Sequence, residues 1–385
     1  MRIAIFSDNF YPEISGVADS IMDTGETLAK RGHKIRFYVP RYSDDDFKFI
    51  GLKNKEKIFN KNVKIVRLSS FPLKSLGQGR LVIPFGRVLM DIKKFNPDII
   101  HAHTMGGLGI EALIASKLYK IPLVLTNHSP KEELVKNIKS SIGKSAFIRY
   151  NLWFYNRGDI ITSPSLKILD YTCLNKDKAR VVPNPIGIQG ISLSNKKKTE
   201  VKNNLGLSNF NLVFCGRVVK SKGIGEVIKA VSLLKHKIQN IKFIVIGQGT
   251  DRDYFEKMSE QFEVKDNVKF LGYKNKREIA KIYSLCQLFI IMGVENQPLA
   301  AMQAMYLGLP FIGSNAGGVP NLVDDGKNGF LIELGDYKSL AKTILYCYTH
   351  PQVTKNISIN AEKSVEKFSS KNVANILENI YKSLL

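Results

Sequence analysis

The chain has 385 residues, of which 44% are hydrophobic and 24% are charged, a composition that is typical of a folded globular protein and excludes a disordered one. This length is too great for one ordinary hydrophobic core, so two domains are expected. The formal net charge of +23 indicates an anionic partner, such as a phosphorylated substrate, a lipid headgroup layer or nucleic acid.

The start of the chain and its cysteines predict where the protein resides. Residues 1–10, MRIAIFSDNF, contain too short an apolar run for a signal peptide, and no run of about 18 apolar residues predicts a membrane span. The four cysteines show no CxxC spacing, which argues against a disulfide framework or a zinc site. We therefore expect a cytoplasmic protein with reduced thiols.

The first half of the chain alternates short apolar runs, typical of buried strands, with helical patterns. Gly16 precedes the first helix, where its missing side chain lets the backbone approach a ligand closely. Asp44 to Asp46 are predicted to lie in a solvated loop and not at a metal site, because three adjacent loop side chains do not converge on one ion. Strands are expected at 2–6, 34–39, 63–68, 122–126, 159–162 and 180–182, and helices at 17–31, 85–95, 107–119 and from 164.

Two histidines follow the carboxyl ends of predicted strands. His103 comes directly after the apolar run that begins at Ile99, and His128 follows the strand at 122–126. Open α/β sheets with parallel strands bind ligands at this edge. We therefore predict a site role for both histidines, most strongly for His128, and the alternative is an ordinary loop histidine with a satisfied hydrogen bond.

Residues 131–157 mix basic and aromatic side chains. Six lysines and arginines are interleaved with residues such as Phe147, Tyr150 and Trp153. Such a mixture suits a segment that lies on an anionic membrane surface. A helix that packs its aromatic residues in the core and exposes its lysines would give the same pattern, so both interpretations stay open.

A linker is predicted between the two halves. Prolines at 183 and 185 and a lysine cluster up to Lys198 continue neither a helix nor a strand. The second half then repeats the alternation, with strands at 212–215, 243–246, 268–271, 288–292 and 310–313. We expect two doubly wound α/β domains at 1–188 and 200–366, a linker at 189–199, and a C-terminal helix within 367–385 that packs back on the first domain.

Residues 293–310, GVENQPLAAMQAMYLGLP, are the most informative stretch of the second half. Glu295 lies in a short polar loop after a strand, and a helix is predicted from Pro298, since proline suits a first helical turn. Free backbone N–H groups and the positive end of the helix dipole make such a corner an anion site.

Basic and glycine-rich loops are predicted at the same edge of the second sheet. Arg217 and Lys222 follow the strand at 212–215, where arginine can grip a diphosphate by a forked contact and lysine can neutralise it as a point charge. Gly247 and Gly249 form a tight turn after the next strand, which leaves room for a ligand and fits a plain turn equally well. We therefore predict a phosphate-binding site at this edge.

A series of short motifs is distributed along the whole chain. Each motif alone is weak evidence for a protein family, but their order and spacing together are specific. They are Gly16-Val17, His101-Ala102-His103-Thr104, Thr126-Asn127-His128, Val182-Pro183-Asn184, Gly216-Arg217, Lys222-Gly223, Gly247-Gln248-Gly249, Glu295 onward, Asn315 to Pro320 and Asp325 to Gly329. In these motifs the chain resembles family 4 of the retaining nucleotide-sugar glycosyltransferases. Its first half is most similar to the branch that glycosylates diacylglycerol.

The resemblance implies the GT-B architecture, in which two Rossmann-like domains face each other across a cleft. Arg217 and Lys222 would hold the diphosphate of a UDP- or GDP-linked sugar, and Gln303 would meet the nucleotide ribose. Glu295 would lie at the transferred sugar and His128 would line the reacting centre, with His103 on the acceptor side. Further donor contacts would come from Gly16, Val17, Gly247, Gly249, Gln297, Pro298, Leu299 and Ala300.

The resemblance also implies a reaction without a metal or another cofactor, because Arg, Lys and a helix N-terminus supply positive charge to the leaving diphosphate. The acceptor would be a lipid or glycan hydroxyl, and the enzyme would act peripherally on the inner face of the membrane. No nucleic-acid partner is expected, since the sequence contains no zinc finger, basic zipper or RNA-recognition pattern.

Two positions depart from the family pattern. Gln303 stands where the family has a second glutamate, so a carboxylate contact to ribose is lost. Pro298 stands where the family has glycine, and it lacks an N–H donor. A binding protein that has kept the fold with weak or lost transfer, and a nucleotide-sugar epimerase of the same architecture, are therefore the alternatives to an active transferase.

Overall fold

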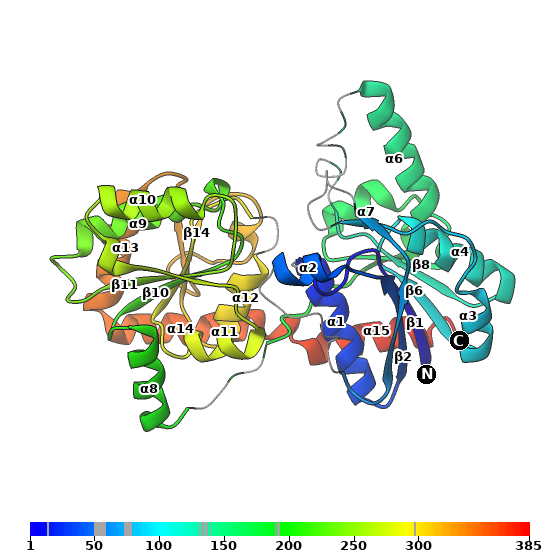
Figure 1. Cartoon of the computed structure of the whole chain (residues 1–385), viewed down its shortest axis with the longest axis horizontal. Coiled ribbons are helices and arrows are strands. Elements are labelled where there is room, and N and C mark those ends of the chain that lie inside the picture. Colours follow the sequence, from blue (N-terminus) through cyan, green and yellow to red (C-terminus); the bar gives the residue numbers. More distant parts are fainter. Residues whose placement is uncertain are drawn as a thin grey trace. The chain divides into compact units, whose positions relative to one another are not determined.

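The structure of the chain, a computed structural model, describes residues 1–13, 15–49, 59–72, 79–129, 131, 135, 138, 140–188, 190, 193–295 and 298–385. These residues form two compact units (Figure 1). Unit 1 comprises residues 1–187 and 368–385, and unit 2 comprises residues 188–367. The last segment of the chain thus belongs to the unit that contains the first.

Unit 1 is built on a seven-stranded parallel sheet. Its strands follow the order β3-β2-β1-β6-β7-β8-β9, so the chain winds outward from β1 to β3 and then restarts on the other side of β1 with β6. The switch point of this sheet lies between β1 and β6. The strands are β1 (Arg2–Phe6), β2 (Lys34–Pro40), β3 (Val63–Leu68), β6 (Ile99–Ala102), β7 (Leu123–Thr126), β8 (Ile160–Ser163) and β9 (Ala179–Val181), and β4 (Phe71–Pro72) pairs with β5 (Arg80–Leu81) in a separate antiparallel ribbon.

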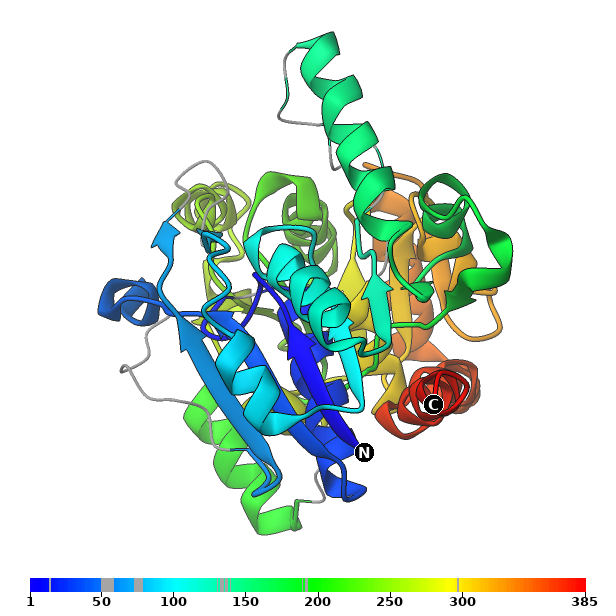
Figure 2. The same cartoon turned by 90° about the vertical axis from the view of Figure 1, so that its right-hand side faces the viewer.

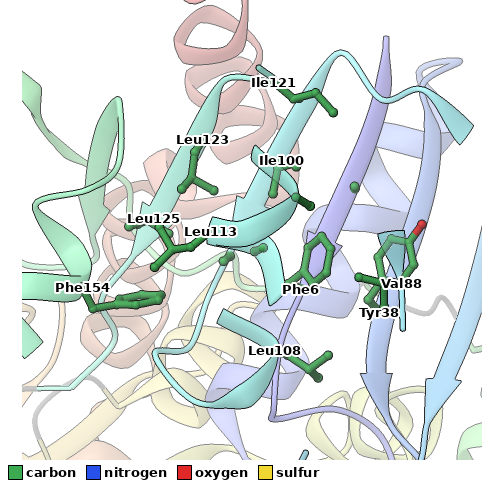
Figure 3. Close-up of a cluster of buried hydrophobic side chains, with 14 of the residues drawn as sticks. Phe6, Tyr38, Val88, Ile100, Leu108, Leu113, Ile121, Leu123, Leu125 and Phe154 are labelled. Carbon is green, nitrogen blue, oxygen red and sulfur yellow. The ribbon is translucent and has the colours of Figure 1, made fainter. Parts of the chain in front are cut away.

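Helices cover both faces of the sheet of unit 1. One face packs Phe6, Ile100 and Leu125 against Leu108 and Phe154 (Figure 3). The other face carries a cluster in which Ile3 and Ile21 pack with Leu377 of the C-terminal helix. The helices are α1 (Gly16–Lys30), α2 (Asp44–Phe49), α3 (Leu89–Phe95), α4 (Gly107–Tyr119), α6 (Ser141–Tyr155), α7 (Leu166–Thr172) and α15 (Ser370–Lys382).

Unit 2 repeats the architecture with six parallel strands in the order β12-β11-β10-β13-β14-β15. Its switch point lies between β10 and β13. The strands are β10 (Asn211–Cys215), β11 (Lys242–Ile246), β12 (Val268–Gly272), β13 (Leu288–Ile291), β14 (Phe311–Ser314) and β15 (Phe330–Ile332), and the helices are α8 (Asn195–Leu205), α9 (Ile224–Leu234), α10 (Arg252–Gln261), α11 (Lys276–Tyr283), α12 (Leu299–Tyr306), α13 (Tyr337–Thr349) and α14 (Pro351–Val365). The predicted pair of doubly wound parallel sheets is confirmed.

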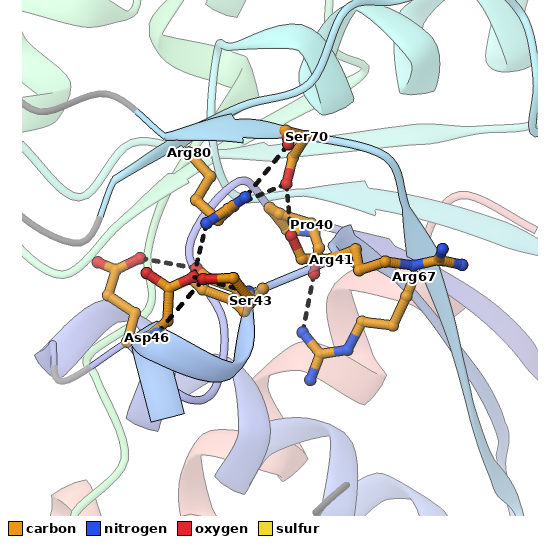
Figure 4. A network of polar contacts seen from close by, with 9 residues as sticks. Pro40, Arg41, Ser43, Asp46, Arg67, Ser70 and Arg80 are labelled. Carbon is orange, nitrogen blue, oxygen red and sulfur yellow. Dashed lines mark hydrogen bonds and ion pairs between the residues drawn. The ribbon is translucent and has the colours of Figure 1, made fainter. Parts of the chain in front are cut away.

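Two predictions about loops are wrong. The expected linker at 189–199 ends early, because α8 begins at Asn195, where the Ser194 side chain accepts the N–H of Lys197 and caps the helix. The acidic run 44–46 forms α2 and not a loop (Figure 4). Asp46 accepts the N–H and hydroxyl of Ser43 and binds the Arg80 guanidinium at 2.6 Å, which gives the charge a partner at the first helical turn.

Two further elements differ from the sequence prediction. α3 starts at Leu89 and not near Phe85. The N–H groups of Phe85 and Gly86 donate to Glu111 Oε1, so the backbone at these residues is held outside the helix. Strand β15 was not predicted. None of the helices among the described residues is both long and apolar enough to span a membrane.

Candidate active site

The loops at the switch point of unit 2 touch each other without intervening side chains. The loop after β10 contains Gly223, which has a φ of +71°, and the loop after β13 contains Gly293. A Cβ on Gly223 would lie 2.4 Å from the Met292 carbonyl carbon, and one on Gly293 would lie 2.2 Å from the Ser221 oxygen. Both positions therefore need glycine, and this close approach brings Lys222 beside Glu295.

Lys222 and Glu295 form an ion pair across the switch point. The Lys222 Nζ lies 2.5 Å from the Glu295 Oε1, and the two side chains are only 15% and 18% exposed. The backbone of Glu295 is fixed in addition, because its oxygen accepts the N–H of Gly318 at 2.6 Å. Open α/β sheets place ligands at this point, beyond the carboxyl ends of the strands. The sequence predicted both residues for the site, and the structure brings them together.

Helix α12 follows Glu295 with its N-terminus at the same edge of the sheet. It begins at Leu299 and not at Pro298, since Pro298 has a ψ of 73° and is the N-cap. Leu299 and Ala300 occupy the first turn, where backbone N–H groups have no partner within the helix. Gln303 lies one turn further along and is 6% exposed. Gln297 lies outside the described residues.

The remaining predicted donor residues of unit 2 surround the end of β10. The guanidinium of Arg217 is exposed, and no described residue forms an ion pair or a hydrogen bond with it. A Cβ on Gly247 would lie 1.9 Å from the Gly216 oxygen, and one on Gly249 would lie 2.2 Å from the Val218 oxygen. The space that these two glycines leave is therefore filled by the backbone of the β10 loop.

Three histidines form a stack at the carboxyl edge of unit 1. The rings of His101 and His103 lie 4.1 Å apart between centroids, and those of His103 and His128 lie 5.4 Å apart. Nδ1 of His103 is 3.1 Å from Nε2 of His128. His103 is 6% exposed, and its Nε2 has no hydrogen-bond partner among the described residues. The two predicted histidines thus contact each other, and Nε2 of His103 is a buried nitrogen that a ligand could bind.

Burial keeps the histidine stack neutral. It lowers the pKa of His101 from 6.5 to about 3 and holds the pKa of His103 well below 6.5. It also lowers the pKa of His128 to about 4, although a hydrogen bond with the Asn184 side chain acts in the opposite direction. Each ring therefore offers one donor and one acceptor near neutral pH.

Asp8 is a candidate site residue that the sequence analysis missed. It follows β1, and its Oδ2 accepts the hydroxyl of Thr104, which follows β6, at 2.5 Å across the switch point of unit 1. Burial raises the pKa of Asp8 to about 6 in spite of that bond. Its position just after the first strand could have indicated it, because His103 and His128 were predicted from the same kind of position at the carboxyl end of a strand.

Gly16 and Val17 open helix α1 of unit 1, whereas the other predicted donor residues belong to unit 2. The Ser15 side chain accepts the N–H of Ala18 and caps this helix. One turn on, the Ser20 hydroxyl donates to Asn184 Oδ1 at 3.1 Å. The start of α1 is thus connected through Asn184 to His128.

The basic aromatic segment contains helix α6, which is buried in one part and exposed in another. Helix α6 buries Phe154 and Tyr155 in the core near its C-terminus, while Ile142 near its N-terminus is 81% exposed and Trp153 is 44% exposed. The two views of the chain show α6 standing away from the sheet of its own unit (Figures 1 and 2). Lys136 and Lys139 lie outside the described residues. Among those described, no three His, Cys, Asp or Glu side chains are placed to hold a metal ion.

Two family models match the chain and together span most of both units. Residues 14–189 match Glycosyltransferase Family 4, and residues 195–364 match Glycosyl transferases group 1. The chain belongs to glycosyltransferase family 4. The motifs identified in the sequence all lie within these two matched regions.

Several members of the family are similar over nearly their full length. The alpha-monoglucosyldiacylglycerol synthase of Acholeplasma laidlawii is 25% identical, and the match covers 100% of this chain and 98% of the relative. The N-acetyl-alpha-D-glucosaminyl L-malate synthase of Bacillus anthracis is 24% identical, with 97% and 96% covered. The names of these relatives give different acceptors, diacylglycerol and malate.

Solved structures of glycosyltransferases share the fold. Anabaena HepE in complex with UDP-glucose superimposes with a TM-score of 0.73 over 100% of both chains at 19% identity. Sucrose-phosphate synthase of Thermosynechococcus elongatus gives a TM-score of 0.75 at 17% identity, covering 100% of this chain and 98% of the other. The GT-B fold that the sequence resemblance implied is thereby confirmed.

Proposed function

We propose that this glycosyltransferase moves a sugar from a UDP- or GDP-linked donor to a hydroxyl of a membrane lipid or glycan, with retention of the anomeric configuration. The observation that carries the proposal is the Lys222–Glu295 pair at the switch point of unit 2, at 2.5 Å. A buried cation beside a carboxylate, next to the N-terminus of α12, suits a ligand that has an anionic diphosphate and a sugar that becomes positively charged in the transition state.

The donor would be held mainly by unit 2. The ammonium of Lys222 has three hydrogens, so it can bind Glu295 and still donate to phosphate oxygens. Arg217, whose guanidinium is free among the described residues, would grip the diphosphate with two parallel bonds. The N–H groups of Leu299 and Ala300 would add to this, and Gln303 would meet the ribose. These groups supply the positive charge, so we propose that transfer needs no metal or other cofactor.

The reaction would proceed on one face of the sugar. As the bond between the anomeric carbon and the diphosphate breaks, its electron pair leaves with the diphosphate, which Arg217 and Lys222 stabilise. The acceptor oxygen attacks from the same face, and its proton passes to the departing phosphate oxygen. Glu295 would stabilise the positive charge on the sugar. The proposal includes no covalent glycosyl-enzyme intermediate and therefore no double displacement of the kind that retaining glycosidases use.

Unit 1 would receive the acceptor. Nε2 of His103 is buried and has no hydrogen-bond partner in the part of the chain that the structure describes. His128, which is bonded to His103, would line the reacting centre. A neutral imidazole is suited to orient a hydroxyl by accepting its proton in a hydrogen bond. The similarity to alpha-monoglucosyldiacylglycerol synthases favours a diacylglycerol hydroxyl as acceptor over a soluble one.

Helix α6 supports the proposal of a peripheral position on an anionic membrane. Its exposed Lys144 and Arg149 accompany the exposed Ile142, which is the combination that an interfacial helix uses. Ile114 and Trp153 line an apolar hollow between α4 and α6, with Lys117 and Arg157 among its other lining residues. Basic groups around apolar surface suit a lipid headgroup layer on the inner face of the membrane.

A binding protein with weak or lost transfer is the second candidate, and Gln303 is the observation that favours it. Gln303 is buried at 6% exposure, in the first turns of α12 where the family pattern has a carboxylate. An amide bonds a ribose hydroxyl less strongly than a carboxylate does. This candidate predicts nucleotide binding without turnover.

A donor screen separates the two candidates. Calorimetry with UDP- and GDP-sugars measures binding, and incubation of the same donors with lipid extracts followed by product analysis measures transfer. We expect one donor class to bind and to yield a glycolipid in the presence of EDTA. Binding without a glycosylated product and without slow donor hydrolysis would instead establish the binding protein.

A further inference from the structure

The C-terminal helix reaches the histidine stack of unit 1. Tyr381 of α15 is completely buried, and its hydroxyl lies 2.6 Å from Nδ1 of His101. On the opposite side of this ring, Nε2 lies 2.6 Å from the hydroxyl of Thr126, which is 2.5 Å from the hydroxyl of Thr162. Both nitrogens of His101 are therefore held by hydroxyl groups from different elements.

His101 supports His103 without being accessible itself. At 1% exposure His101 cannot contact a substrate, but its ring lies parallel to that of His103 within 30°, at a centroid distance of 4.1 Å. His103 is bonded on its Nδ1 side to His128. The ring of His103 is thus fixed by a stacked neighbour and by one hydrogen bond, and only its Nε2 lacks a partner among the described residues.

The contact with His128 bears on where the proton of His103 lies. Nδ1 of His103 is 3.1 Å from Nε2 of His128. When Nδ1 of the neutral His103 carries the ring proton, it donates to Nε2 of His128. Nε2 of the neutral His103 is then an acceptor, which suits the proton of a substrate hydroxyl.

We propose that Tyr381 and Thr126 are positioning residues of the transferase, which clamp His101 so that His103 presents Nε2 to the acceptor hydroxyl. This inference rests on the proposed function. It gives the return of the chain into unit 1 a role in the site, because α15 then supplies a hydroxyl that holds His101 against the substrate-binding ring of His103. Rings that contact substrate need such support, since a shift of about 1 Å is enough to weaken binding.

A purely structural role for Tyr381 would be to anchor α15. That anchor exists elsewhere on the same helix, where Glu378 binds Nε2 of His33 at 2.9 Å and the guanidinium of Arg31 at 3.1 Å. Glu378→Gln weakens the attachment of α15 without touching the histidine stack. It is therefore the matched control for Tyr381→Phe, which removes one hydroxyl and keeps the packed ring.

The test compares Tyr381→Phe, Thr126→Val and Glu378→Gln in the full chain. We expect the KM for the acceptor to rise roughly tenfold in each of the first two variants, as for one lost hydrogen bond to a buried group, with the donor Kd unchanged. Glu378→Gln should lower the Tm and leave the acceptor KM unchanged. An acceptor KM within twofold of wild type in Tyr381→Phe, or an equal rise in Glu378→Gln, would overturn the inference.

A second measurement does not depend on transfer. The chain has six histidines, so nitrogen NMR can follow each ring. Tyr381→Phe should shift the ring nitrogens of His103 as well as those of His101, and unchanged His103 signals would overturn the inference. A wild-type chain that transfers no sugar while Tyr381→Phe still shifts His103 would contradict the proposed function and support the clamp.

Discussion

Lys222 has the central role among the single residues of the proposed site. Its ammonium is bonded to Glu295 in a position where both side chains are less than one fifth exposed, so little water screens the charge. A lysine needed only for solubility would be exposed, as the neighbouring Lys220 is. The burial of Lys222 beside Glu295 is what the proposal expects of a charge that serves a ligand.

Replacement of this ammonium should slow transfer strongly. We expect Lys222→Ala to lower kcat/KM by a factor of about 30 to 1000, which corresponds to about 2–4 kcal/mol of lost transition-state stabilisation. Lys220→Ala is the matched control, because Lys220 is exposed in the same turn and its Nζ lies 4.1 Å from the ring centroid of Tyr254. A Lys222→Ala rate within a few-fold of wild type would show that the diphosphate binds elsewhere.

The proposed contact between Gln303 and the ribose can be tested by a variant that is expected to bind the donor more tightly. Gln303→Glu should tighten nucleotide-sugar binding about three- to tenfold, because a carboxylate bonds a hydroxyl more strongly than an amide does. Calorimetry with the preferred donor measures the change, and Gln303→Ala, which should bind more weakly than wild type, is the control. Unchanged affinity in both variants would place the ribose away from this position.

The sequence predicted the site residues that directly follow a strand, but it did not predict the contact between Tyr381 and His101. His103, His128 and Glu295 each follow a predicted strand, so their place at the sheet edge could be predicted from periodicity alone. The bond between Tyr381 and His101 joins residues 280 positions apart. No local sequence pattern predicts such a contact, because the sequence of α15 is that of an ordinary amphipathic helix. Only the fold places α15 against β6.

At the scale of elements, α6 is the segment whose sequence left two structures open. The structure shows a division along one helix, with Phe154 buried at one end and Ile142 exposed at the other. Periodicity could not predict this, since the same helix packs on the sheet and then extends beyond it. The exposed part is what the membrane proposal uses.

Removal of basic charge from α6 should weaken membrane binding. We expect the double variant Lys144→Gln with Arg149→Gln to cosediment less with anionic vesicles, by about 1 kcal/mol per charge, or roughly tenfold or more in total. The double variant Lys196→Gln with Lys197→Gln removes the same charge from the exposed start of α8 in unit 2 and should bind as wild type does. Equal binding by both variants would contradict a specific role of α6.

The two wrong loop predictions, at residues 189–199 and 44–46, have different causes. Lysines favour a helix about as well as most residues do, so the cluster after Ser194 needed only a cap to begin α8. The aspartates of α2 needed the Arg80 partner, which lies 34 positions beyond Asp46. The first signal was present in the sequence near the helix, whereas the second depends on the fold.

At the scale of the whole molecule, the buried histidines make stability depend on pH. The pKa of His101 is lowered to about 3 and that of His128 to about 4, so below pH 6.5 the unfolded chain binds protons that the folded chain does not. The contribution of the neutral histidines to the free energy of unfolding is fully present above about pH 6.5 and is lost as the pH decreases toward 4. Asp8, with a pKa raised to about 6, acts in the opposite direction between about pH 4 and 6 and offsets part of the loss.

Denaturant unfolding at several pH values tests this dependence. Trp153 is the only tryptophan of the chain, so its fluorescence reports on unit 1. The free energy of unfolding should fall between pH 7 and 5 by on the order of 1–2 kcal/mol for each histidine that resists protonation. His128→Asn should lose less over the same range. A wild-type value that stays constant or rises would contradict the burial of the stack.

The two-unit architecture was predictable because strands and helices alternate twice with a proline-containing break between the repeats. The return of residues 368–385 to unit 1 follows from an amphipathic helix that needs an apolar face to cover, and HepE and sucrose-phosphate synthase show the same fold.

The stereochemistry of the product tests the central proposal most directly. The wild-type chain is incubated with the preferred nucleotide sugar and a lipid acceptor in the presence of EDTA, and the anomeric proton of the glycolipid is measured by NMR. We expect a product with the same anomeric configuration as the donor. An inverted configuration, or no glycosylated product from a donor that binds, would contradict retaining transfer by this protein.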